Sequence, residues 1–299
     1  MPPPLRVAVI SRAVMPLHGL GGLERSVHDL VRHLAQRGVD VTLIVPPPEA
    51  VRHDIRSDPF SSPHIQLRHV RYLTFPFANR RGTTILDRST SYLLYGLRAG
   101  RLAHSLAVQG DADVVHGFGA SLLGAALSKK VVPLVLNPQG LEEFGATAAT
   151  QSAMKRVAYA PLQWAVRRSA QAADCIIATD EALESTVARH LHPRAGQMRT
   201  IPNGIDLVET SGFAGPADGA IVRQRRGFGA GELVLLSVGR LEFNKGFDVL
   251  ANALGRAASP TSSLTATGWR WVIVGTGPYR REIEHEVEAR GIANHVIFA

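Results

Sequence analysis

The chain has 299 residues, 45% of them hydrophobic, with a formal net charge of +8 and a single cysteine. This length and apolar content can supply the cores of two domains, and one cysteine excludes an internal disulfide. We expect that cysteine, Cys175, to be a buried packing residue. No nucleic-acid-binding motif accompanies the positive charge, so we expect no nucleic-acid partner.

The N-terminus, Met1-Pro-Pro-Pro, leads directly into a predicted strand. It has neither the basic start nor the apolar core of a signal peptide, and no apolar run in the sequence is long enough to span a bilayer. We therefore expect a cytoplasmic protein, and peripheral contact with the inner face of the membrane stays open.

The first elements are a strand at Arg6–Ile10, a helix that ends near Gln36 and a strand at Val41–Val45. This order predicts the start of a doubly wound parallel sheet. The loop before the helix lacks a G-x-G-x-x-G dinucleotide fingerprint. Its glycines, Gly21 and Gly22, would let backbone N–H groups approach a ligand, and a flexible turn is the alternative.

A strand near Ile65–Val70 and a helix over Ser89–Leu106 follow. The helix mixes apolar and basic residues, which suits either a membrane surface or packing on the sheet. We expect packing, because this is the commoner role of such a helix.

Asp111 and Asp113 precede a strand that begins at Val114 and carries His116. The two aspartates resemble a metal-binding D-x-D pair. Ligands of open α/β sheets bind at the carboxyl ends of the strands, so aspartates at the amino end predict no metal site. We expect His116 at the carboxyl end, where a ligand would bind, and a purely structural histidine is the alternative.

Gln139 follows the next strand, Val131–Leu136, and is expected at the same edge of the sheet. Its amide can bind a sugar hydroxyl or a phosphate. The remainder of the first domain is predicted as helix, strand, helix and strand at Ser152–Ala173, Cys175–Ala178, Glu181–Arg189 and Met198–Ile201.

Asn203-Gly204 predicts a tight turn with a positive φ angle, and Asp206 closes this segment. Glycine, proline and aspartate then crowd between Gly212 and Gly219, which is typical of a linker. We expect a first domain over residues 1–205, an interdomain linker over 206–232 and a second domain over 233–299.

The stretch Leu233–Gly246 organises the second domain. Its apolar run predicts a fully buried parallel strand, and helical spacing resumes from Phe247. Between them lie two cations with glycines beside them, Arg240 and Lys245 with Gly239 and Gly246. Cations at a helix start suit a diphosphate, and a surface arginine and lysine without a ligand is the alternative.

A second strand of this domain, Arg270–Val274, ends on Gly275 and Gly277. Glycines after a strand permit close approach of the backbone to a ligand. The sequence ends in a third strand, Val296–Phe298.

Several blocks together resemble the retaining glycosyltransferases of family 4, which have the GT-B architecture. The blocks are Gly21-Gly22-x-Glu24, Asp113-Val-Val-His116, Ile201–Asp206, Val238–Leu241 with Lys245-Gly246, and Val274–Pro278. Their order and spacing carry the resemblance. It implies an α/β protein with two facing Rossmann-like domains, each with a parallel sheet, and an active site in the cleft between them.

The resemblance also implies transfer of a sugar, with retention, from a nucleotide-sugar donor to a glycan, lipid-linked or small-molecule acceptor. Arg240 and Lys245 would stabilise the charge on the leaving diphosphate, with no metal and no other cofactor. Gly21, Gly22, Gly239, Gly275 and Gly277 would lie near the donor. His116 and Gln139 would contact the sugar or the acceptor, and the interdomain turn would comprise Asn203, Gly204 and Asp206.

The sequence departs from the family in two ways. Gln139 stands where many members have a histidine, and a glutamine cannot act as a general base. The paired-glutamate motif E-x7-E does not occur, and the second domain is expected to be incomplete. A transferase is therefore weighed against a non-catalytic remnant that only binds. A sugar-nucleotide epimerase of the same fold fits the block around Arg240 less well.

Overall fold

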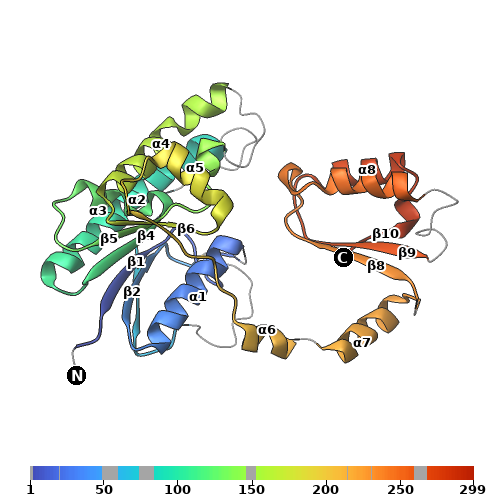
Figure 1. Cartoon of the computed structure of the whole chain (residues 1–299), viewed down its shortest axis with the longest axis horizontal. Helices are drawn as coiled ribbons and strands as arrows, with labels where there is room; N and C mark the ends of the chain where they lie inside the picture. The colour runs from blue at the N-terminus through green and yellow to red at the C-terminus, as the bar shows by residue number, and fades with distance from the viewer. Residues whose placement is uncertain are drawn as a thin grey trace. The chain divides into compact units, whose positions relative to one another are not determined.

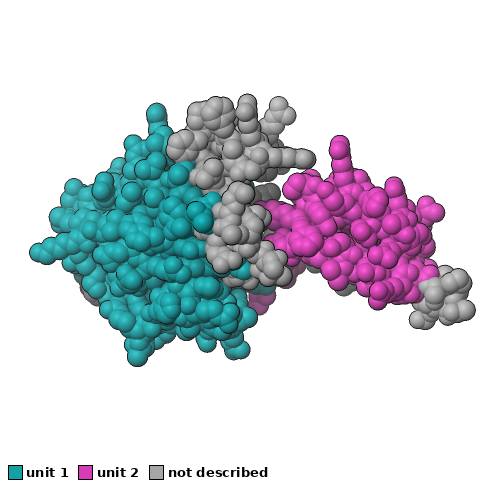
Figure 2. Space-filling model, turned by 90° about the horizontal axis from the view of Figure 1, so that it is seen from above, with its two compact units in different colours: residues 1–206 teal, residues 207–299 magenta. Residues whose placement is uncertain are grey.

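The computed structural model describes residues 3–19, 21–48, 60–73, 84–145, 153–213, 215–229, 231–258 and 268–299. The chain divides into two compact units, Met1–Asp206 and Leu207–Ala299, which are drawn in Figures 1 and 2. No helix among the described residues combines the length and the apolar character that crossing a bilayer requires.

Unit 1 consists mainly of alternating strands and helices, although β2 and β3 are successive strands among the described residues. Its elements are β1 (Arg6–Ile10), α1 (Gly22–Gln36), β2 (Asp40–Val45), β3 (Ile65–His69), α2 (Thr84–Gln109), β4 (Val114–Phe118), η1 (Gly119–Leu122), α3 (Leu123–Leu127), β5 (Leu134–Asn137), η2 (Glu142–Phe144), α4 (Ala153–Ala172), β6 (Cys175–Ala178), α5 (Glu181–Leu191) and β7 (Met198–Thr200). Ser152, where we expected the α4 helix to begin, lies outside the described residues.

The strands of unit 1 form one seven-stranded sheet in the order β3-β2-β1-β4-β5-β6-β7. Every pair of neighbouring strands is parallel. The predicted doubly wound sheet is thus confirmed. The direction of winding reverses between β1 and β4, and the loops that follow these two strands therefore flank the crevice where such sheets bind ligands.

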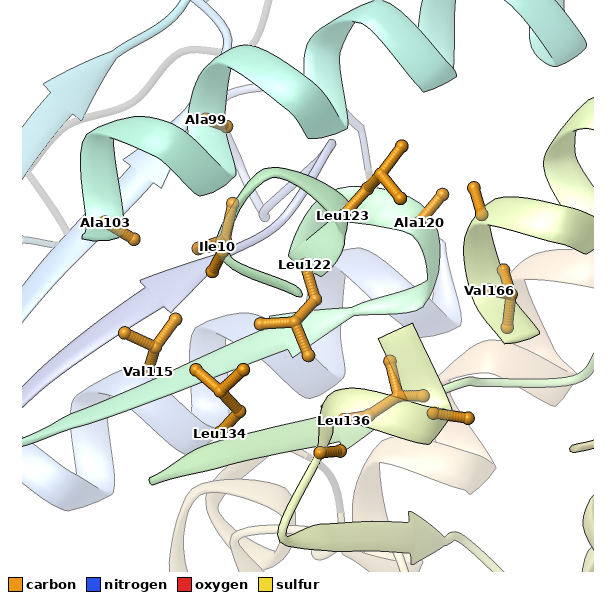
Figure 3. Close-up of a cluster of buried hydrophobic side chains, with 14 of the residues drawn as sticks. Ile10, Ala99, Ala103, Val115, Ala120, Leu122, Leu123, Leu134, Leu136 and Val166 are labelled. Carbon is orange, nitrogen blue, oxygen red and sulfur yellow. The ribbon is translucent and has the colours of Figure 1, made fainter. Parts of the chain in front are cut away.

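Each face of this sheet supplies one hydrophobic cluster. Ala8 and Ile10 of β1 point into the cluster beneath α2, α3 and α4, whereas Val7 and Val9 point into the cluster beneath α1. Figure 1 shows α1 on one face of the sheet and α2 to α5 on the other. Figure 3 shows part of the larger cluster, whose labelled members are Ile10, Ala99, Ala103, Val115, Ala120, Leu122, Leu123, Leu134, Leu136 and Val166.

Helix α2 packs on the sheet, as expected, with Tyr95, Ala99 and Ala103 fully buried. Glycines let it approach the segment after β4 closely, because a Cβ atom on Gly124 would lie 2.1 Å from the Leu97 carbonyl oxygen. The hydroxyl of Tyr95 donates to the carbonyl oxygens of Ser11 and Ile44, at 2.5 and 3.1 Å. The helix thereby fixes the carboxyl ends of β1 and β2.

Unit 2 begins with two helices and continues as a small sheet. Its elements are α6 (Leu207–Phe213), α7 (Pro216–Arg226), β8 (Leu233–Val238), η3 (Phe243–Lys245), α8 (Phe247–Ala257), β9 (Trp269–Val274), α10 (Arg280–Ala289), η4 (Ala293–His295) and β10 (Val296–Phe298). The segment that we predicted as a linker from its glycine content thus contains the helices α6 and α7. The three strands are parallel, in the order β10-β9-β8.

The prediction that β8 is fully buried is wrong. Helices α8 and α10 cover one face of the sheet, where Trp269, Trp271 and Ile273 of β9 are buried. On the other face Leu236 and Val238 of β8 are 64% and 71% exposed. An apolar strand is buried on both sides only when both faces of its sheet are covered, so the apolar run alone could not decide this.

Two further expectations are also wrong. Gly204 does not adopt a positive φ angle, and no turn is assigned to residues 201–206, where we predicted a tight turn. Cys175 is half-buried rather than buried, since it lies on the face of β6 opposite to Ile176 and Ala178, which belong to the larger cluster. Burial raises the pKa of its thiol.

Candidate functional site

The connection from β8 to α8 carries the two predicted cations. Leu241 is fully buried and anchors this loop, while Arg240 and Lys245 on either side are exposed. Gly246 has a φ angle of 69° and occupies the N-cap position of α8, where no side chain caps the first turn. The free N–H groups of a helix start therefore lie in the same short loop as two cations, an arrangement that attracts anions.

Arg240 has a partner that we did not predict. Its guanidinium contacts a Glu242 carboxylate oxygen at 2.9 Å, although the arginine side chain is 66% exposed. Lys245 forms no ion pair with any residue that the structure describes. An exposed pair of this kind contributes little to stability, so an anion can compete with Glu242 for the guanidinium at small cost.

Gly275 and Gly277 hold a second loop against the first. The Gly239 N–H donates to Val274 and the Leu241 N–H to Thr276, each at 3.0 Å. A Cβ atom on Gly275 would lie 1.9 Å from the Gly239 carbonyl oxygen, and one on Gly277 would lie 2.2 Å from that of Leu241. The two glycines are therefore required by packing between loops, whereas Gly239 has open space around it. Their predicted contact with a donor stays a prediction.

In unit 1, Gly21 and Gly22 lie where the sequence places them. Gly21 is the N-cap of α1 and Gly22 its first residue, and no side chain caps this helix. A Cβ atom on Gly22 would meet no other atom within 4 Å, so the backbone there is open to a ligand. The Glu24 side chain folds back over Gly21.

His116 is not at the end of its strand, as we expected, but in the middle of β4, because the strand continues through Gly117 to Phe118. Its ring stacks on that of Phe118, with 5.0 Å between centroids. Burial lowers the pKa of His116 to about 4, so the ring is neutral at pH 7. Its Nε2 atom is buried and has no hydrogen-bond partner among the described residues.

A pocket of about 370 Å³ lies between α1 and residues 201–205, and His116 forms part of its lining. Helix α1 and its C-cap residue contribute polar side chains at helical spacing, Ser26, Asp29 and His33 from the helix and Arg37 from the cap. Burial alone would raise the pKa of Asp29, but hydrogen bonds from Arg25 and His28 lower it below its ordinary value. Our sequence reasoning missed this polar stripe, although its spacing of three to four residues was a readable signal.

The residues predicted as the interdomain turn are tied to the same helix. The Ser26 hydroxyl donates to Asn203 Oδ1 at 2.8 Å, and Arg32 Nη2 donates to Asp206 Oδ2, also at 2.8 Å. The chain therefore leaves unit 1 along α1, the helix that begins at Gly22.

Gln139 lies in the loop after β5, close to the pocket. Its backbone N–H and its side-chain Nε2 both donate to Asn137 Oδ1, at 3.2 and 2.9 Å. Asn137 in turn lines the pocket beside His116. Gln139 has a φ angle of 59°, a conformation that side chains other than glycine rarely adopt and that often marks functional loops.

Asp113 lies at the amino end of β4, as predicted. Its carboxylate accepts two hydrogen bonds from the Arg6 guanidinium, at 2.7 and 3.1 Å. These bonds hold the pKa of Asp113 below its ordinary value. Its role is therefore to join the starts of β1 and β4, on the side of the sheet away from Gly22 and Gln139.

Comparison with known proteins identifies the family. The profile of glycosyltransferase family 4 matches residues 20–209, and that of the glycosyl transferases group 1 matches residues 220–299. The chain belongs to glycosyltransferase family 4. The predicted resemblance is thereby confirmed.

Two curated relatives illustrate the similarity. A D-inositol 3-phosphate glycosyltransferase of Acidothermus cellulolyticus is 29% identical over 99% of this chain and 65% of its own length. A glycogen synthase of Mycobacterium tuberculosis is 26% identical over 88% of this chain and 61% of its own length. The chain thus spans somewhat less than two thirds of these relatives.

Solved structures give the fold. Anabaena Alr3699/HepE in complex with UDP superimposes with a TM-score of 0.64 at 17% identity, over 98% of this chain and 68% of that one. WaaG, a glycosyltransferase involved in lipopolysaccharide biosynthesis, gives a TM-score of 0.62 at 18% identity, with coverages of 98% and 69%. This likeness confirms the GT-B fold class.

Proposed function

We propose that the protein transfers a sugar from a nucleotide-sugar donor to an acceptor, with retention of anomeric configuration and without a metal ion. The β8–α8 loop carries this proposal, because Arg240, Lys245 and the uncapped start of α8 all favour an anion there. The family relationship supports it, since relatives that the chain matches are named as glycosyltransferases.

The proposed chemistry follows from how charge moves in the reaction. As the glycosidic bond to the donor breaks, negative charge grows on the oxygens of the leaving nucleoside diphosphate. Cations placed at that point bind the transition state more strongly than the ground state and so raise kcat. Arg240 and Lys245 would supply these charges in place of a metal. Gly239 would allow close approach of the diphosphate, because nothing lies within 4 Å of the position that a Cβ atom would occupy there.

Unit 1 would bind the sugar or the acceptor through His116 and Gln139. A neutral His116 with an unpartnered Nε2 can accept or donate one hydrogen bond to a hydroxyl group. Gln139 would act as a binding residue and not as a base. The acceptor would be a glycan, a lipid-linked sugar or a small molecule, and a lipid-linked acceptor would require the protein to meet a membrane surface.

Calorimetric titration with UDP, GDP and ADP, followed by transfer assays with the matching sugar nucleotides, tests the proposal. Replacing Arg240 or Lys245 with alanine should weaken diphosphate binding and lower kcat by about a hundredfold. Arg225→Ala and Arg226→Ala on α7 serve as controls, because both side chains are also exposed cations of unit 2. Transfer should continue in excess EDTA.

The outcome also separates the two interpretations of the sequence. Diphosphate binding that depends on Arg240 and Lys245, without transfer from any donor, would favour a protein that only binds. A strict requirement for Mg²⁺ or Mn²⁺, or normal turnover in the double variant, would overturn the mechanism.

A further inference from the structure

Helix α4 presents apolar side chains outward as well as inward. Its inner side places Leu162, Ala165 and Val166 in the larger core cluster of unit 1. On its outer side, Val157 is 74% exposed and Trp164 51% exposed. Seven residues separate them, which is two helical turns, so both lie on one face. The exposed residues between them are Ala160 and Pro161, which are also apolar.

Trp164 differs from the other two tryptophans of the protein. Trp269 and Trp271 are buried in the core of unit 2. An exposed tryptophan on a helix whose other side already packs in the core adds nothing to that core. Tryptophan side chains favour the boundary between lipid headgroups and acyl chains, because the ring is apolar and its N–H is polar.

Cations follow this apolar stripe directly. Arg167 and Arg168 lie one turn beyond Trp164, and the sequence of α4 contains four cations and no acidic residue. The Arg167 guanidinium lies 4.9 Å from the centre of the Phe144 ring, and its Nε donates to the His190 carbonyl oxygen at 3.1 Å. Burial lowers the pKa of His190, and the nearby cations Arg167 and Arg189 lower it further. This end of the helix is therefore a site of concentrated positive charge.

We propose that the outer side of α4, from Val157 to Arg168, is a docking surface for membranes that contain anionic lipids. Val157 and Trp164 enter the headgroup–acyl boundary, while Arg167 and Arg168 contact lipid phosphates. The helix lies on the membrane and does not cross it. Charge complementarity selects this partner, because a stripe that combines an exposed tryptophan with cations and no carboxylate fits an apolar surface rimmed by phosphates.

This docking does not depend on the proposed transferase activity, since its residues are separate from Arg240, Lys245, His116 and Gln139. Co-sedimentation with vesicles of phosphatidylcholine, with and without about a third of phosphatidylglycerol, measures it directly. We expect the chain to bind the anionic vesicles and to be released by salt. Absence of binding to anionic vesicles would overturn the proposal.

Substitutions assign the binding to α4. Val157→Ser with Trp164→Ser should abolish it, and Arg168→Gln alone should weaken it by about fivefold. The matched controls are Val249→Ser on α8, where the valine is 68% exposed, and Arg226→Gln on α7. Equal losses in the controls would show that any exposed apolar or basic residue serves, which would also overturn the proposal.

Quenching of tryptophan fluorescence by lipids shows which part of the protein contacts the membrane. Brominated lipids quench only those indoles that enter the acyl region, and the buried Trp269 and Trp271 should not respond. We expect quenching in the natural protein and none in Trp164→Phe, which keeps an aromatic ring and a correctly folded helix. Quenching that persists in Trp164→Phe would place the membrane contact elsewhere.

Discussion

Both units are built from β–α repeats, but the first strand of unit 1 is buried whereas the first strand of unit 2 is partly exposed. In unit 1 the side chains of Val7, Ala8, Val9 and Ile10 in β1 are all buried, because α1 covers one face and α2 the other. In unit 2 the equally apolar β8 exposes Leu236 and Val238. The difference teaches that an apolar run specifies a strand, whereas its burial depends on elements that lie elsewhere in the chain.

Two leucine substitutions test this comparison most strongly. Leu136→Ala in β5 removes a fully buried side chain and should lower the free energy of unfolding by about 2–5 kcal/mol. Leu236→Ala in β8 removes a side chain that is already in solvent and should change it by less than about 0.5 kcal/mol. Urea denaturation of both variants measures the two values. A cost above about 1 kcal/mol for Leu236→Ala would show that something covers β8 in solution.

The free energy of unfolding of unit 1 should depend on pH through the protonation of His116. In the unfolded chain its pKa is near 6.5, whereas burial holds it at about 4 in the fold. Below pH 6.5 the unfolded state therefore binds a proton that the folded state does not. The contribution of neutral His116 to the free energy of unfolding should be complete above pH 6.5. It should fall by up to about 3 kcal/mol as the pH drops to 4.

His116→Asn should remove this part of the pH dependence. The measurement is the free energy of unfolding at several pH values between 4 and 7.5 for the natural and variant proteins. His285→Asn, a change of an exposed histidine in α10, provides the control. Parallel curves for the natural protein and His116→Asn would mean that the pKa of His116 is the same in the folded and unfolded states, which would contradict its depression by burial.

Two glycine substitutions in unit 2 distinguish a glycine needed for packing between loops from one that leaves room for a ligand. Gly277→Ala would bring a Cβ atom to 2.2 Å from the Leu241 carbonyl oxygen, and it should destabilise unit 2 by about 1–3 kcal/mol. Gly239→Ala meets no atom within 4 Å and should leave stability unchanged. The fluorescence of the buried Trp269 and Trp271, followed during denaturation, measures the stability of unit 2 in both variants. Loss of UDP binding in a stable Gly239→Ala protein would sharpen the proposed role of that position; a stable Gly277→Ala protein would contradict the packing argument.

The smallest expected difference between the two units is in their rates of degradation by a protease. Helices α6 and α7 are exposed along most of their length, so within unit 2 trypsin should cut first at Arg223, Arg225 or Arg226. The remainder of unit 2, with one apolar sheet face exposed, should then be degraded about tenfold faster than unit 1. Mass spectrometry of the fragments over time gives both rates. Equal resistance of the two units would contradict the comparison drawn from β1 and β8.

Much of the candidate site could be predicted from local sequence, because its glycines and cations stand next to strand ends. Gly21 and Gly22 lie at the start of α1, and Arg240 and Lys245 lie in the connection between β8 and α8, where alternating apolar runs and helical spacing place them. His116 and Glu242 could not be placed in this way. A strand that runs two residues further moves a histidine from the sheet edge to a buried position beside the pocket, and an ion pair depends on side-chain directions that spacing does not give.

The sequence by itself determined the order of strands and helices, the parallel sheet of unit 1, the family and the position of the loops that follow each strand. These features follow from periodicity and from motifs a few residues long. Only the tertiary structure decided that β8 is half-exposed, that Gly277 serves loop packing, and that α4 turns Val157 and Trp164 outward. Each of these depends on which distant segments cover a surface, and that is a property of the assembled layers, not of any local stretch of chain.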